Sequence, residues 1–222
     1  MYPFVDYTKN FIKGICPHKC EYCFMRDYWK NMKEPRLDET EFKEDLGHDF
    51  FIFVGSSIDN FADVIPSEWI VKELSYCSSF DNHYLFQSKN PKRFNEFVPL
   101  FPSWTTLGTT LETNRDTSFI SSAPCPVARF MAFSEIKNFE KMVSIEPIMD
   151  FDLEEFLSMF KIIKPKFVSI GADSKNNNLP EPSKEKVELL IKELKKFTEV
   201  KIKSNLNRLI RERSTRKGTS LD

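Results

Sequence analysis

The chain is poor in glycine and has no long apolar run. Six of its 222 residues are glycine, where about fifteen would be average for this length. No apolar run exceeds the five residues from Phe50 to Val54, and the amino terminus shows no basic flank followed by an apolar segment. We therefore expect no membrane span and no secretory signal. The chain also has little net charge. Its 32 Lys and Arg and 33 Asp and Glu give a formal charge of -1, so the overall charge does not call for a polyanionic partner.

Cysteine is scarce too, with five residues. An odd count without an export signal argues against a disulfide framework and predicts reduced thiols in a cytoplasmic protein. Such thiols are core residues, metal ligands or nucleophiles. The apolar fraction of 41%, with 22 phenylalanines, is enough for a substantial core and excludes disorder as the main description.

Short apolar runs recur about every thirty residues, the length of a strand plus its crossover helix. Most are continuous, as is typical of strands buried on both faces of a parallel sheet. This spacing predicts an α/β fold, either an open sheet or a (βα) barrel. The expected strands are Phe11 to Ile15, Phe50 to Val54, Tyr84 to Gln87, Thr105 to Thr109, Met142 to Ile145, Phe167 to Ile170 and Val200 to Ile202.

Three segments between these runs have a helical apolar stripe. Asp152 to Lys161 places apolar residues at i, i+3, i+4 and i+7, and Asp152 with Glu155 has the spacing of a capping box. Ser183 to Phe197 repeats this pattern, and Ser67 to Ser79 does so more weakly. The sequence therefore predicts helices in these three segments.

Three of the five cysteines, Cys16, Cys20 and Cys23, form a C-x3-C-x2-C cluster directly after the first expected strand. A structural zinc site needs four ligands, normally from two separated pairs, and no second pair is present here. Three thiolates on one loop suit a 4Fe-4S cluster that leaves one iron open to another ligand. Zinc remains the alternative.

The motif, with Tyr22 just before its last cysteine, resembles the signature of the radical S-adenosylmethionine (SAM) superfamily. The resemblance implies a partial (βα)6-type TIM barrel with parallel strands, in which Cys16, Cys20 and Cys23 bind a 4Fe-4S cluster and SAM chelates the fourth iron. It also implies a reductant such as flavodoxin or ferredoxin. One electron then cleaves SAM to methionine and a 5'-deoxyadenosyl radical, which abstracts hydrogen from the substrate.

Further blocks narrow this resemblance. In order, FVGSSIDNFADVIP, QSKNPKRF, LGTTLETN, VSIEPIMDF and VSIGADS look like the pattern of a phage-associated radical SAM family with affinities to spore photoproduct lyase, an enzyme of DNA repair. The likeness covers roughly residues 11 to 205. This chain is shorter than usual between the cysteines and the second strand, which leaves less material for a substrate-binding extension.

In (βα) barrels, ligands bind where the strands end. By position in the superfamily, a segment after the second strand meets the methionine amino group, and residues after the fourth strand meet ribose or methionine. Glu146 follows a fully apolar strand and needs a partner if it is buried. Four glycines in or beside strands suggest close backbone approach to a ligand. The resulting cofactor-binding candidates are Tyr22, Gly55, Ser56, Ser57, Thr109, Glu112 and Gly171. Glu146, which would flank adenine or substrate, is a candidate catalytic residue.

The two remaining cysteines lie apart from the cluster, so a second iron-sulfur cluster is not expected. Cys77 lies on the apolar face of an expected helix and is interpreted as a core residue. Cys125 lies between two prolines. In chemistry like that of photoproduct lyase, a loop cysteine can return hydrogen to a product radical, and Cys125 is the candidate, with an inert loop thiol as the alternative.

We expect residues 1–206 to form the barrel and residues 207–222 to form a basic helix end and tail, which is solvated or contacts phosphate. Tyr28, Trp29, Tyr84 and Trp104 could stack on bases or pack in the core. The resulting hypothesis is a radical SAM enzyme acting on a nucleic acid or nucleotide-derived substrate. The alternatives are radical modification of a small molecule or peptide, and a non-enzymatic zinc or iron-sulfur module. The sequence does not indicate the oligomeric state.

Overall fold

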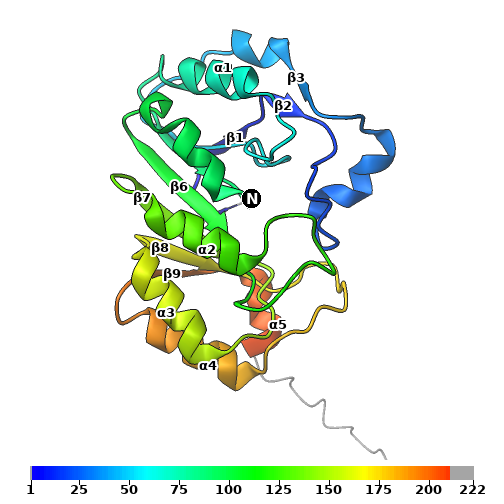
Figure 1. The fold of residues 1–222 in the computed structure, drawn as a ribbon, viewed down its shortest axis with the longest axis vertical. Helices are drawn as coiled ribbons and strands as arrows, with labels where there is room; N and C mark the ends of the chain where they lie inside the picture. The colour runs from blue at the N-terminus through cyan, green and yellow to red at the C-terminus, as the bar shows by residue number, and fades with distance from the viewer. Residues whose placement is uncertain (1, 211–222) are drawn as a thin grey trace, which may run out of the picture.

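Seven parallel strands hydrogen-bond side by side in chain order in the computed structural model, which describes residues 2–210. The sheet curls into a half-barrel, which confirms the predicted α/β partial barrel (Figure 1). All six neighbouring pairs are parallel, so every carboxyl end lies at the same edge. The strands are β1 (Tyr7–Lys9), β4 (Phe51–Val54), β5 (His83–Gln87), β6 (Thr105–Thr110), β7 (Glu140–Ile145), β8 (Phe167–Ile170) and β9 (Glu199–Ile202).

Helices connect most of these strands and lie on the outer side of the sheet (Figure 1). The α-helices are α1 (Ser67–Cys77), α2 (Pro126–Glu135), α3 (Leu153–Ile163), α4 (Lys184–Leu194) and the short α5 (Asn207–Ile210). Short 3-10 helices occupy the loops: η1 (Phe24–Asn31), η2 (Glu39–Lys43), η3 (Pro91–Glu96), η4 (Val98–Leu100) and η5 (Ser204–Leu206). Within residues 2–210, none of the helices has both the length and the apolar character that crossing a membrane requires.

The prediction of the first strand at Phe11 to Ile15 is wrong. The sheet begins earlier, at β1, and Ile12–Lys13 forms β2 of a separate antiparallel ribbon with β3 (Arg36–Leu37). Gly14 has φ +141°, and a Cβ there would lie 2.7 Å from the carbonyl oxygen of Glu34. The close passage of the chain's own backbone therefore explains Gly14, and burial of Phe11 and Ile12 in the main core explains the apolar run.

The three predicted helices are confirmed as α1, α3 and α4, but the capping box at the start of α3 is wrong. The carboxylate of Asp152 does not cap α3; it accepts hydrogen bonds from Arg115 Nε and Nη2 at 3.0 and 2.8 Å. Helix α2 was not predicted. Its sequence signal is Pro126 at the first helical position, where the missing N–H costs nothing.

The inner face of the sheet changes from apolar to polar along the strands. Near the amino ends, Leu85, Met142 and Phe167 pack against Tyr2 and Val5, so the amino-terminal segment fills this part of the curl. Nearer the carboxyl ends, the inward side chains include Gln87, Thr110 and Ser144. The packing leaves a space with a polar floor at the carboxyl edge.

The carboxyl-terminal part of the predicted tail, residues 211–222, lies outside the described residues. Arg208, which the sequence places in that basic segment, contacts the loop after β8 instead of projecting from the fold. Its Nη2 donates to the carbonyl oxygen of Asp173 at 2.8 Å, and its Nη1 donates to Glu181 at 2.7 Å. Arg208 is therefore part of the structural framework of this loop.

Candidate cofactor site at the carboxyl ends of the strands

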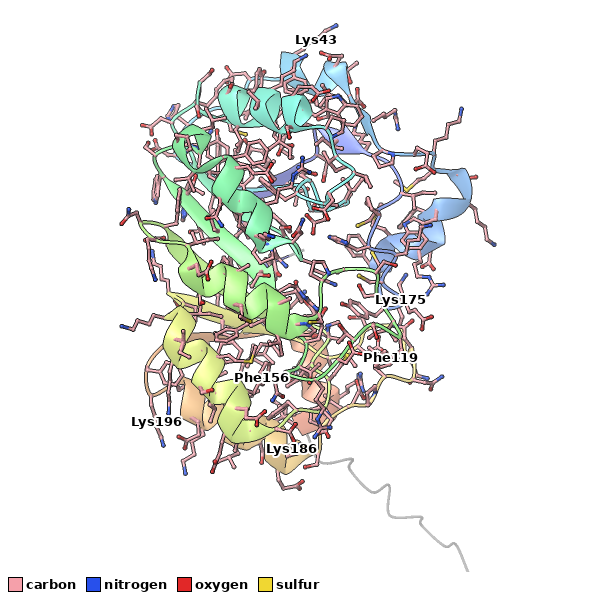
Figure 2. All side chains as sticks on the ribbon, in the orientation of Figure 1. Lys43, Phe119, Phe156, Lys175, Lys186 and Lys196 are labelled. Carbon is pink, nitrogen blue, oxygen red and sulfur yellow. The ribbon has the colours of Figure 1, made fainter. Side chains whose placement is uncertain are left out.

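A cavity of about 550 Å³ opens at the carboxyl edge of the sheet. It is lined by the cysteine loop and by residues from the ends of β4 to β9, which are neighbours in the sheet. Figure 2 shows Lys175 and Phe119 in the loops on this side of the molecule, and Lys196 on the far side, beyond the helices. The fold therefore brings the predicted cysteine motif and the predicted strand-end residues to one place.

The cysteine loop connects the β2–β3 ribbon region to η1, and all three of its cysteines line the cavity. Two turns shape the loop: Lys19 N donates to Cys16 O at 3.2 Å, and Cys23 N donates to Cys20 O at 3.1 Å. Burial raises the pKa of the Cys16 thiol to about 12 and also raises the pKa of Cys23. Thiolates in such a place need a strong positive charge, which iron supplies.

The donor set fits a cluster better than a single ion. In the part of the chain that the structure describes, no three His, Cys, Asp or Glu side chains form a group that could hold one metal ion. A cubane cluster binds each thiolate to a different iron, so its ligands need not converge on one point. Three thiols around one cavity, without a fourth protein ligand, therefore fit a 4Fe-4S cluster with one open iron.

A buried charged network lies beneath the cysteine loop. Lys89 Nζ lies 3.2 Å from both Cys20 Sγ and Glu112 Oε1, and the hydroxyl of Tyr22 donates to Glu112. Burial alone would raise the pKa of Glu112, but Arg129 and Lys89 lower it to about 2. Glu112 and Arg129 are fully buried, with Oε2 and Nη2 2.9 Å apart. Glu112 is thus ionised and engaged by protein cations, and it does not line the cavity.

A second buried pair attaches the loop to the sheet. His18 Nε2 lies 2.9 Å from Asp59 Oδ2, and Asp59 also accepts from the backbone N–H groups of Phe61 and Lys89 at 3.0 and 2.7 Å. Burial opposes ionisation of Asp59, but His18 and these hydrogen bonds hold its pKa below the usual value. The pair connects the cysteine loop to the segments after β4 and β5. Sequence reasoning missed it, because His18 and Asp59 are 41 positions apart.

The segment Gly55-Ser56-Ser57 lines the cavity directly after β4. Gly55 has φ +79°, and a Cβ there would lie 2.7 Å from the amide nitrogen of Asn60. Asn10 Oδ1 accepts hydrogen bonds from Ser57 N at 3.0 Å, Ser57 Oγ at 2.9 Å and Ser56 Oγ at 3.2 Å. Asn10 therefore fixes the segment, and sequence reasoning gave it no role.

Glu146 lines the cavity, and both of its carboxylate oxygens have partners. Oε2 accepts from Lys203 Nζ at 2.6 Å, and Oε1 accepts from Asn205 Nδ2 at 2.9 Å. Gly171 does not line the cavity, but a Cβ there would lie 2.6 Å from Glu146 Oε1. The carboxylate of Glu146 therefore occupies the space beside Gly171. The absence of a side chain at Gly171 is what allows Glu146 to lie there.

The structure separates two other candidates from the cavity. Thr109 is buried and donates its hydroxyl to the carbonyl oxygen of Ser88 at 2.8 Å, whereas its neighbour Thr110 faces the cavity. Cys125 is exposed at the start of α2 and does not line the cavity. Cys77 is buried in the core, as predicted.

The floor of the cavity contains polar side chains that sequence reasoning missed. The Tyr2 hydroxyl donates to Gln87 Oε1 at 2.8 Å, and Gln87 Nε2 donates to Thr110 Oγ1 at 2.9 Å. The only available signal was the alternation of Leu85 and Gln87 on one face of β5. The floor thus offers fixed hydrogen-bonding groups below the level of the cysteines.

No protein-family model and no curated protein matches this sequence. Solved structures do share its fold. A spore photoproduct lyase mutant with dinucleoside spore photoproduct aligns with TM-score 0.66 at 11% identity, covering 91% of this chain and 77% of that one. Another mutant, with bound AdoMet and the dinucleoside, gives 0.59 at 10%, covering 89% and 63%. SuiB of Streptococcus suis, bound to precursor peptide SuiA, gives 0.63 at 11%, covering 90% and 49%.

Spore photoproduct lyase and SuiB are both radical SAM enzymes, and at such low identity the likeness defines the fold of this chain. The chain spans less than two thirds of the AdoMet-bound structure and about half of SuiB. The narrower resemblance to a phage-associated family stays a prediction.

Proposed function

We propose that this protein is a radical SAM enzyme whose 4Fe-4S cluster is bound by Cys16, Cys20 and Cys23. The observation that carries the proposal is that all three cysteines line one cavity at the carboxyl ends of a partial barrel. A structure with the same fold binds AdoMet. When bound, the reduced cluster supplies the electron that cleaves SAM homolytically.

The chain's own residues would prepare this chemistry. The three thiolates leave one coordination position for the amino and carboxylate groups of SAM. The Gly55-Ser56-Ser57 segment, fixed by Asn10, lines the cavity and would hold the SAM amino group through its backbone and hydroxyl oxygens. Tyr22 lines the cavity and could contact the cofactor directly. Thr109, Glu112 and Gly171 do not line it and would act by holding its walls.

The proposed substrate is a nucleic acid or a nucleotide-derived molecule. Two observations support this class: the neighbouring lyase structures bind a dinucleoside, and the cavity floor has paired hydrogen-bonding groups suited to a nucleobase edge. Glu146 and Lys203 lie at the wall of the same cavity and would orient the substrate or adenine. The peptide-bound state of SuiB makes a peptide the second candidate.

A flavodoxin or ferredoxin would supply the electron, and a cytosolic location stays a prediction. The role of Cys125 in returning hydrogen stays a prediction as well. Since its thiol lies outside the cavity in this structure, that role would require the loop before α2 to move.

Iron and sulfide analysis of the anaerobically reconstituted protein tests the proposal. We expect about four irons per chain, and loss of the cluster in single alanine variants at Cys16, Cys20 and Cys23. The matched controls, Cys77→Ala and Cys125→Ala, should retain it. Stoichiometric zinc that resists oxygen, without iron, would contradict the proposal. Deuterium-labelled DNA, RNA and peptide pools then test the substrate class by transfer of label to 5'-deoxyadenosine.

A further inference from the structure

A second groove lies beside the candidate cofactor cavity. Its volume is about 590 Å³, and the residues that line it are Asn10, Lys13, Asn31, Met32, Lys33, Arg36 and Ser57. Ser57 also lines the cofactor cavity, so the two spaces adjoin. Three of the seven groove residues are cations, and none is acidic.

Two of the three cations are available to a ligand. Lys13 is already neutralised, since its Nζ lies 2.9 Å from Asp38 and 2.5 Å from Glu41. Lys33 and Arg36 are exposed, and neither side chain has a partner among residues 2–210. Their backbone is fixed nonetheless. Ile15 N donates to Lys33 O at 2.9 Å, and Arg36 pairs with Lys13 in the β2–β3 ribbon. The ribbon and the segment that precedes β3 therefore hold two free positive charges at the groove.

Helix η1 runs from the cavity to this groove. It begins at Phe24, which lines the cavity, and ends at Asn31, which lines the groove. No residue of η1 is buried, although it contains three aromatic side chains. Phe24 and Tyr28 are 58% and 60% exposed, so most of each ring is accessible to a ligand. At roughly 2 Å per residue, η1 spans about 16 Å.

We propose that η1 and the β2–β3 ribbon form a track for a single nucleic-acid strand. Bases would stack on Phe24 and Tyr28, and backbone phosphates would contact Lys33 and Arg36. Exposed rings beside free cations are the combination by which proteins bind unpaired strands without reading sequence. An acidic peptide would use the cations but would leave the ring faces without a planar partner.

This proposal rests on the proposed function and deepens it, because the strand would lead its target nucleotide into the cofactor cavity. Because the two rings and the two cations are spread along η1 and the adjoining groove, a single nucleotide would make only part of these contacts. The enzyme should therefore prefer an oligonucleotide to a mononucleotide. In Figure 1 the ribbon and η1 lie away from α3 and α4, which leaves room for a matched control on those helices.

Fluorescence anisotropy of the full chain with labelled single-stranded DNA and RNA 12-mers tests the proposal, and the two arms identify the sugar that is preferred. Lys33→Ala/Arg36→Ala should weaken binding at least tenfold at low salt. It should also reduce the slope of log K against log salt by about 1.4, at about 0.7 per phosphate contact. Tyr28→Ala should weaken binding without changing this slope. Lys192→Ala/Lys195→Ala, which removes the same charge from exposed positions at the end of α4, should leave both quantities unchanged.

Binding by the Lys33/Arg36 variant equal to that of the wild type would overturn the track, as would equally tight binding of a mononucleotide or tighter binding of an acidic peptide. SAM cleavage without substrate separates this failure from failure of the proposed function. If 5'-deoxyadenosine forms but the affinity for single strands does not depend on Lys33 and Arg36, the track is wrong and the proposed chemistry stands. If strand binding depends on Lys33 and Arg36 but the wild-type protein does not cleave SAM, the proposed chemistry is wrong.

Discussion

The Nζ of Lys89 lies 3.2 Å from the Sγ of Cys20, although the two residues are 69 positions apart in the chain. Lys89 follows the end of β5, and Cys20 belongs to the cysteine loop. Parallel strands with all carboxyl ends at one edge make this contact possible. A fixed cation therefore lies beside one of the three sulfur atoms to which we assign the cluster.

Removing this cation should make the cluster harder to reduce. Reduction adds negative charge to the cluster, which a neighbouring cation stabilises, so Lys89→Met should lower the midpoint potential by on the order of 50 mV. Lys89→Arg keeps the charge and serves as the control. Potentiometric titration followed by electron paramagnetic resonance measures the shift. An unchanged potential in Lys89→Met would show that the lysine does not act on the cluster.

Bulkier residues at two glycines should weaken SAM binding. Alanine at Gly171 would displace Glu146, and alanine at Gly55 would meet Asn60 at a backbone angle that L-residues rarely adopt. We expect at least a tenfold loss of SAM affinity by calorimetry for each. Gly47 also has a positive φ, +63°, but lies outside the cavity. Gly47→Ala should therefore lower stability and leave SAM affinity unchanged. SAM affinity that is unchanged in both site variants would refute this placement.

The buried Glu73 should make stability depend on pH. Burial raises its pKa from the ordinary value of 4.5 to about 8, and Asn60 Nδ2, which donates to both carboxylate oxygens, opposes this rise only in part. The folded state therefore binds a proton that the unfolded state releases above about pH 4.5. The contribution of Glu73 to stability is full below pH 4.5 and is lost as the pH rises to about 8.

Glu73→Gln, a neutral isostere, should remove this dependence. Relative to the wild type, its free energy of unfolding should increase between pH 5 and pH 8 by at least about 1 kcal/mol. Urea titrations of both proteins at several pH values measure the difference. Parallel pH profiles would mean that Glu73 does not titrate between these limits.

The ion pair between Arg129 and Glu112 should show strong coupling. Arg129→Met leaves a buried carboxylate with one cation fewer, so we expect a loss of about 3 kcal/mol in unfolding free energy. Adding Glu112→Gln removes the unpaired charge and should restore part of this loss. Additive effects in the double-mutant cycle would contradict direct coupling.

Much of the sheet could be predicted from sequence because strands such as β8 are buried along their whole length, and short apolar runs mark most of the others. The run KFVSI became β8, and FFIFV contains β4. The first strand was misplaced because Phe11 and Ile12 are apolar for another reason: they are buried in the main core without belonging to the seven-stranded sheet. An apolar run reports burial, and it does not report the pairing partner.

The part of the site that could be predicted is the part whose residues are close to one another in the sequence or directly follow a predicted strand. The three cysteines lie within eight residues, and the strand-end rule located Gly55, Ser56 and Glu146 near them. Contacts between distant segments, such as His18 with Asp59 and Asn10 with Ser57, have no periodic signal. They arise from how the loops fold over the sheet edge, which only the structure shows.

The central claim is that the three clustered cysteines support reductive cleavage of SAM. The most direct measurement is 5'-deoxyadenosine formed by the anaerobically reconstituted protein with SAM and dithionite, quantified by liquid chromatography. The account predicts product that depends on dithionite, that persists in Cys77→Ala and Cys125→Ala, and that disappears in each of the variants at Cys16, Cys20 and Cys23. A reconstituted protein with about four irons per chain that forms no 5'-deoxyadenosine would contradict it.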